Sequence, residues 1–150
     1  MSKIIDFYKC IVPDNKGRML TDMWNQTPEQ LELEHDYIQW MFPLNEVSGF
    51  NTDAPILTEE DIYKFTSSEK LLTTLAESFK VILKFYGFEI YDSINIMIGF
   101  STDFTERSKI WITPGNHNFL RITRILKCLI LLGQTKYAME FLNVLSLFIT

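Results

Sequence analysis

The sequence predicts an all-α protein, a compact single-domain bundle of about six or seven helices over residues 1–150. Apolar residues recur at the helical spacing i, i+3, i+4 through most of the chain. Helix-start signals precede several of these runs, and glycines close two of the longest. With 47% hydrophobic and 14% aromatic residues, the chain can form a large core without disulfides or a metal.

Short helices are expected first at residues 2–10 and 18–24. A stronger start signal follows at Thr27, where a capping threonine precedes a proline, and Gln30 can complete a capping box. This helix is predicted to end before Pro43, because a residue that precedes proline disfavours the helical conformation. Its two apolar stripes indicate packing on two sides.

The middle of the chain contains the longest irregular segment, residues 43–57. Loops of this length in a compact domain are often functional. Thr58 begins a short helix at about 59–65, and a long helix then runs to Tyr86. Gly87 is expected to end it in a left-handed conformation.

The last third is helical after one ambiguous stretch. Residues 88–100 alternate between apolar and polar, so a small hairpin there is an alternative to irregular structure. A turn or two of helix is expected at 102–109. Two longer helices follow at 117–132, closed by Gly133, and at 135–148.

The helix at 117–132 carries the most informative polar residues. At 100° per residue, His117, Arg121 and Arg124 share one stripe of an otherwise apolar helix. A buried guanidinium needs an anionic partner. Structural ion pairs would use the carboxylates of Glu32, Glu34 or Asp36. Alternatively, the two arginines line an anion-binding cleft, with His117 and the helix dipole adding to it; simple surface exposure is the third possibility.

Charge and motif content exclude several function classes. The chain has 14 Lys and Arg against 19 Asp and Glu, a net charge of −5, which argues against nucleic-acid binding. Two histidines and two cysteines lack zinc-ligand spacing, and no phosphate-binding glycine loop or nucleophile elbow is present, so neither metal, cofactor nor catalytic residue is expected. The sequence shows no transmembrane segment and no signal peptide, which favours the cytoplasm.

Three stretches resemble one known family. Leu31–Pro43 reads LELEHDYIQWMFP and is followed by Asn51 and by the APILT run of residues 54–58. Residues 84–88 read KFYGF. His117–Lys127 reads HNFLRITRILK, with a Leu-Gly pair five residues further on. In order and spacing these strings are similar to the conserved region of the opioid growth factor receptor family over nearly the whole chain.

The resemblance implies an all-helical domain without the repeat-containing C-terminal extension of the family's named receptors. For those receptors it implies binding of the short opioid peptide Met-enkephalin, growth inhibition, and association with the nucleus and its membrane. A nuclear location or peripheral membrane association is therefore the alternative to the cytoplasm, on the resemblance alone.

These observations predict a receptor-like binding domain for a short peptide or another small anion. The expected ligand-binding residues are His117, Asn118, Arg121, Arg124, His35 and Trp40. Two other functions stay open. One is an enzyme acting on a small anionic substrate, with His117 or His35 as acid or base. The other is a scaffold that binds a protein partner through exposed aromatic surface.

Overall fold

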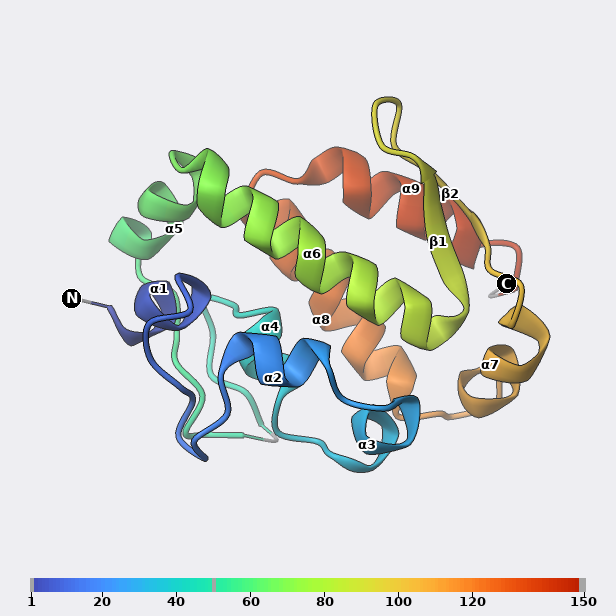
Figure 1. Ribbon diagram of the computed structural model, residues 1–150, viewed down its shortest axis with the longest axis horizontal. Coiled ribbons are helices and arrows are strands. Elements are labelled where there is room, and N and C mark those ends of the chain that lie inside the picture. The colour runs from blue at the N-terminus through green and yellow to red at the C-terminus, as the bar shows by residue number, and fades with distance from the viewer. Residues whose placement is uncertain (1, 50, 149–150) are drawn as a thin grey trace. The chain divides into compact units, whose positions relative to one another are not determined.

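The computed structural model describes residues 2–49 and 51–148 (Figure 1). The predicted fold class is confirmed: the protein is 55% helical, with nine helices and one two-stranded hairpin in the described residues. The elements are α1 (Lys3–Tyr8), α2 (Leu20–Trp24), α3 (Pro28–Leu33), α4 (Ile38–Met41), α5 (Glu59–Thr66), α6 (Glu69–Tyr86), β1 (Phe88–Asp92), β2 (Met97–Phe100), α7 (Phe104–Trp111), α8 (Asn118–Leu131) and α9 (Thr135–Leu145). None of the described helices combines the length and the apolarity that crossing a membrane requires.

The chain divides into two compact units, residues 1–78 and 79–150, with the boundary inside α6. The first contains α1 to α5 and the beginning of α6. The second contains the end of α6, the hairpin and α7 to α9. Organisation of residues 1–150 as a single domain stays a prediction.

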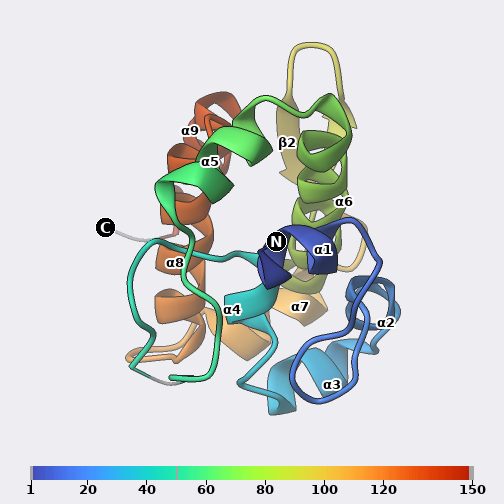
Figure 2. The ribbon, with the colours of Figure 1, turned by 90° about the vertical axis from the view of Figure 1, so that its left-hand side faces the viewer.

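A polar cluster fastens the helices of the first unit to one another. The Tyr8 hydroxyl donates to the carbonyl oxygen of Met41 and lies 3.0 Å from Ser78 Oγ. The same serine oxygen accepts a hydrogen bond of 2.8 Å from the Trp24 indole. Ser78 and Tyr8 are buried, so these bonds satisfy groups that water cannot reach. They link α1, α2, α4 and α6, and α1 also packs beside α5 (Figure 2).

Two predicted helix starts in the first unit are confirmed. The Thr27 side chain accepts from the Gln30 amide at 3.2 Å, and the Gln30 side chain accepts in return from the Thr27 amide at 2.9 Å. Thr58 and Asp61 form the same reciprocal pair at the start of α5, at 3.1 and 2.9 Å. Both capping boxes satisfy amide groups that have no partner inside the helix.

The expected continuous helix from Thr27 to Pro43 is wrong, because the chain breaks between α3 and α4. Glu34 is extended, with ψ of 135°, and ends α3. The Tyr37 hydroxyl then donates to the Leu31 carbonyl oxygen at 2.8 Å, taking up an oxygen at the end of α3. The break directs the side chains of Glu34 and Asp36 toward Arg18, which no local sequence signal indicates.

In the second unit, residues 88–100 form the small hairpin. Its strands are antiparallel, with Phe88 opposite Phe100. Gly87, between α6 and β1, has φ of +96°, so the predicted left-handed end of α6 is confirmed. A Cβ atom at Gly87 would lie 2.9 Å from the Cα of Phe104, so α7 approaches the backbone there.

Aromatic side chains fill the core of the second unit. Phe79 contacts Phe141 edge-on at 5.5 Å between ring centroids, and Phe88 lies 5.8 Å from Trp111. The Trp111 indole donates to the carbonyl oxygen of Tyr86 at 2.9 Å, which satisfies its one polar group. Around this core α8 packs against α9, and α9 against β2. The arrangement holds α8, which carries three of the predicted ligand-binding residues and is directly preceded by a fourth, His117.

Candidate functional site

The start of α8 is built by the turn that precedes it. Gly115 has φ of +67°, and Asn116 follows it. The Asn116 side-chain oxygen accepts from the Asn118 backbone amide at 2.9 Å, and its backbone oxygen accepts from the Phe119 amide at 3.1 Å. The first amides of α8 are therefore bonded within the chain. Any anion at this end meets the helix dipole and side chains rather than open amide hydrogens.

Asn118 anchors α8 within the second unit. Its side chain is completely buried. Its amide nitrogen donates to the Asn116 side-chain oxygen at 3.0 Å, and its own side-chain oxygen accepts from the Tyr86 hydroxyl at 3.1 Å. Both ends of the amide are thus bonded to protein, so in this structure Asn118 positions the first turn of the helix.

His117, Arg121 and Arg124 lie on the predicted stripe of α8. His117 is exposed, Arg121 is only 5% exposed, and Arg124 is partly buried. Neither guanidinium is without a partner in the structure. Burial raises the pKa of the Cys128 thiol, and the positive charge of Arg124 opposes that rise. Arg124 and Cys128 are therefore close in space, as their four-residue spacing on a helix requires.

The two remaining predicted residues belong to the first unit. Trp40 is 1% exposed, and its ring packs edge-on against Phe7 at 5.1 Å. The Lys3 ammonium lies 5.4 Å from the centroid of the Trp40 ring. The indole nitrogen of Trp40 has no hydrogen-bond partner among residues 2–49 and 51–148. His35 is exposed, and its backbone oxygen accepts from Gln39 at 3.3 Å.

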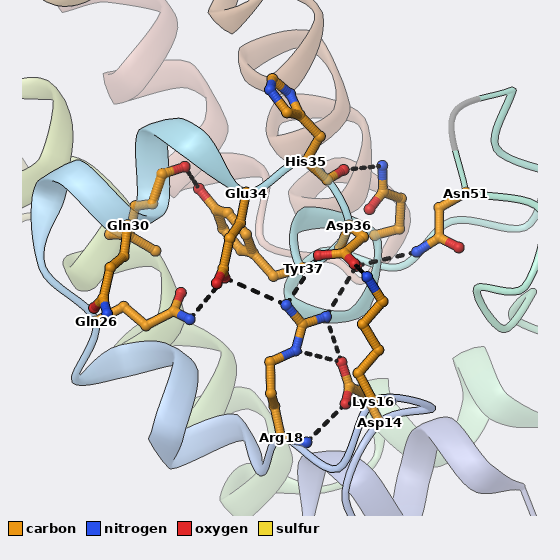
Figure 3. Close-up of polar contacts among 12 residues, drawn as sticks. Asp14, Lys16, Arg18, Gln26, Gln30, Glu34, His35, Asp36, Tyr37 and Asn51 are labelled. Atoms are coloured by element: carbon orange, nitrogen blue, oxygen red, sulfur yellow. Dashed lines mark hydrogen bonds and ion pairs between the residues drawn. The ribbon is translucent and has the colours of Figure 1, made fainter.

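A charged network around Arg18 is a feature that the sequence did not predict (Figure 3). Arg18 Nε and Nη2 both donate to Asp14 Oδ2, at 2.9 and 2.6 Å, and Nη1 donates to Asp36 Oδ1 at 2.9 Å. Glu34 lies 3.3 Å from the same nitrogen, and Lys16 forms an ion pair with Asp36. One guanidinium thereby connects the turn before α2 to the break between α3 and α4. The only indication of this network in the sequence is the group of three charged residues Asp14, Lys16 and Arg18.

The network also holds the long irregular segment. Asn51 donates from its side-chain nitrogen to the Asp36 backbone oxygen at 3.0 Å. The two ends of the segment meet where the Leu57 amide donates to the Leu44 carbonyl oxygen at 2.8 Å. Asn51 therefore ties the segment to the residues that Arg18 binds (Figure 3).

The ion pairs shift the pKa values of the network. Burial alone would raise the pKa of Asp36, but hydrogen bonds from Lys16 and Arg18 outweigh it and hold the pKa below its usual value. Burial would lower the pKa of Arg18, but its bonds to Asp14 and Asp36 raise it instead. The shifts of Asp36 and Arg18 thus both favour the charged form.

We expect the stabilising contribution of Asp36 to be lost in acid. Because its pKa is lower in the folded state, its contribution is present above the unfolded value of about 3.9 and is lost as pH falls through the folded value. Asp36→Asn should reduce the slope of the unfolding free energy against pH below about pH 4. Urea unfolding at a series of pH values measures this slope. Equal slopes for Asp36→Asn and the wild type would contradict the expectation.

The structure thus places the predicted residues in two groups. Asn118, Arg121 and Arg124 lie on the first half of α8 and His117 directly precedes that helix, all in the second unit, while His35 and Trp40 belong to the first. In the part of the chain that the structure describes, no group of three His, Cys, Asp or Glu residues is arranged to hold a metal ion.

Comparison with known proteins gives one consistent result. A family model described as the opioid growth factor receptor (OGFr) conserved region matches residues 4–149. The opioid growth factor receptor of Rattus norvegicus is 36% identical over 139 residues, which cover 89% of this chain and 23% of that protein. The human protein of the same name is 37% identical over 110 residues, 73% of this chain and 16% of the relative.

A second group of relatives carries a related name. Opioid growth factor receptor-like protein 1 of Rattus norvegicus is 33% identical over 135 residues, covering 87% of this chain and 28% of that protein. The chain therefore spans between 16% and 28% of the lengths of these relatives. No solved structure matches it. The match to the family model extends across both compact units, and the chain belongs to the opioid growth factor receptor conserved-region family.

Proposed function

We propose that this chain is a receptor-type binding domain that captures the anionic group of a short peptide, or another small anion, on the first half of α8. The relatives are named opioid growth factor receptor or opioid growth factor receptor-like protein, which supports a peptide of the opioid type as the ligand. The observation that carries the proposal is Arg121. This residue is 5% exposed on a mostly apolar helix, one turn from Arg124 on the same stripe.

Each residue of the α8 group has a distinct role in this proposal. Arg124, which is partly buried, donates two parallel hydrogen bonds to the ligand's carboxylate, the geometry that a guanidinium fork favours. Arg121, which is more buried, adds positive charge near the bound carboxylate. His117, which is exposed, donates a further hydrogen bond to the ligand. Asn118 holds the first turn in place through its bonds to Asn116 and Tyr86.

We also propose His35 and Trp40 as ligand-binding residues within the first unit, separately from the α8 group. A cavity of about 500 Å³ there is lined in part by Lys3, Ile56 and Lys64. Because the Lys3 ammonium also lies over the Trp40 ring, Trp40 is close to this recess.

Substituting Arg124 is expected to abolish the preference for a free carboxylate while the fold is kept. Titration calorimetry of the 150-residue chain with Met-enkephalin as free acid should show saturable heat, and the amidated peptide should bind at least about tenfold more weakly. Arg124→Gln should remove the difference in affinity between the acid and the amide, because it removes the guanidinium that binds the carboxylate.

Lys127→Gln is the matched control, since Lys127 is an exposed cation on the same helix. It should bind like the wild type. Heats that stay at the level of dilution for both peptides would overturn the proposal, and so would equal loss in the two variants.

A scaffold that binds a protein partner is the second candidate. Large apolar side chains on α8 and α9 are exposed, among them Leu120 at 59%, Ile130 at 57% and Met139 at 49%. Multi-angle light scattering at rising concentration tests whether the partner is another copy of the chain. Association that Met139→Lys removes supports the scaffold, and a constant monomer mass argues against self-association. The enzyme alternative stays a prediction without a described feature that favours it.

We also propose that residues 1–150 act as one domain and that the chain works in the cytoplasm, with a nuclear location or peripheral membrane association as the alternative. The single family match across residues 4–149 supports the first point. The free cysteines Cys10 and Cys128 support a reducing compartment.

A further inference from the structure

In the second unit, the Arg107 side chain has a buried polar atom for which the surrounding residues that the structure describes provide no hydrogen-bond partner. Arg107 lies on α7, is partly buried, and points to the side of the helix that carries Phe104 and Trp111. Its Nε is buried and has no hydrogen-bond partner among the described residues. A buried N–H donor without a partner is costly unless another group compensates it.

The neighbouring carboxylates of α7 are already engaged. Asp103 accepts a hydrogen bond of 2.5 Å from the Ser101 hydroxyl, and Glu106 pairs with Lys109 at 3.3 Å. Elsewhere in this unit Lys136 pairs with Glu140 at 3.1 Å. Lys109 and Lys136 thus have ion-pair partners, whereas in residues 79–148 the more buried Arg107 side chain forms neither a described ion pair nor a described hydrogen bond.

Packing fixes where this guanidinium lies. Its central carbon is 5.8 Å from the centroid of the Phe85 ring, at the end of α6. The stem is held near Gly87, where an added Cβ would lie 3.0 Å from the Cβ of Arg107. A side chain confined in this way loses little further entropy when it binds a ligand.

Aromatic rings continue from Arg107 to the surface. Phe104, which also lies against Gly87, contacts Phe100 at 4.6 Å between centroids. Phe100 is 48% exposed, and Phe148 lies 5.8 Å from it. An apolar group that covers Phe100 can therefore place an attached anion toward the guanidinium.

From this arrangement we propose that Arg107, Phe100 and Phe104 form a binding site for an organic carboxylate carried next to an aromatic or apolar group. The guanidinium takes the carboxylate, and the exposed face of Phe100 takes the apolar part. The site lies on α7 and the hairpin and does not depend on the function proposed for α8.

The test uses the 150-residue chain labelled with ¹⁵N, and N-acetyl-phenylalanine as the probe. The Nε–Hε signal of Arg107 and the backbone amides of α7 should shift saturably with the free acid. N-acetyl-phenylalaninamide, which lacks the carboxylate, should bind at least about tenfold more weakly. Inorganic phosphate tests whether the site binds any anion. Because phosphate lacks the aromatic ring, it should bind more weakly than the free acid.

Two variants and two controls make the outcome decisive. Arg107→Met should abolish the shifts of the α7 amides. Arg107→Lys keeps the charge but loses the planar guanidinium, so it should weaken binding several-fold. The lysine variant keeps the test valid if the methionine variant does not fold. Lys109→Met, at the exposed partner of Glu106, should bind like the wild type. So should Arg124→Gln, which separates this site from that on α8. Equal binding of acid and amide, phosphate binding as tight as the acid, or full binding by the Arg107 variants would overturn the proposal.

Discussion

Gly87→Ala is expected to lower the free energy of unfolding by about 3 kcal/mol. Two costs add at this position. Alanine resists the left-handed φ of +96°, and its Cβ would lie 2.9 Å from the Cα of Phe104, a backbone atom that cannot move without shifting α7. Urea unfolding followed by circular dichroism measures the change.

Gly17→Ala is the matched control for Gly87→Ala. Gly17 also has a positive φ, of +80°, but nothing lies within 4 Å of the Cβ that alanine would add. It should therefore show the conformational cost alone, about 1 kcal/mol. If the two variants lose equal stability, close packing of α7 against Gly87 contributes nothing, and the structural explanation is wrong.

Arg18→Met is expected to destabilise the protein by a similar amount, about 3 kcal/mol. The substitution keeps the length of the side chain but leaves Asp14, whose side chain is 0% exposed, beside Asp36 and Glu34 without the guanidinium between them. Removing one partner from such a network costs more than the pair contributed, because the remaining charges stay desolvated. Thermal unfolding and urea unfolding both measure the loss.

Lys16→Met is the control for the charge effect. Lys16 also pairs with Asp36, but its side chain is 62% exposed, so its loss should cost less than about 0.5 kcal/mol. In the double variant Arg18→Met with Asp36→Asn, part of the stability should return, since one of the stranded carboxylates is gone. A loss below about 1 kcal/mol for Arg18→Met would indicate that water, rather than the guanidinium, solvates these carboxylates.

Local chemistry explains which elements could be predicted from the sequence. The capping boxes at Thr27 and Thr58 and the left-handed Gly87 involve residues within four positions of one another, so their pattern is visible in the chain. The break after Glu34 is different. It is stabilised by Arg18, sixteen residues earlier, and by the Tyr37 hydroxyl, neither of which changes the local helical pattern.

The same distinction applies to the candidate site. The 3.6-residue period sufficed to put His117, Arg121 and Arg124 on one stripe of α8. It could not indicate that Asn118 would bond to Tyr86, because that contact depends on how α6 and α8 pack. Nor could it identify Arg107, since an arginine on a short amphipathic helix ordinarily faces solvent.

The hydroxyl of Ser78 couples the unfolding of several helices of the first unit. Its oxygen meets both the Tyr8 hydroxyl and the Trp24 indole, which come from different helices. Removing the amino-terminal helix therefore exposes a cavity and also strips one polar neighbour from a buried serine. Residues Lys3–Tyr8 consequently belong to the cooperative folding unit, and the amide protons bonded within this helix should exchange with solvent only when the helices around Ser78 open together.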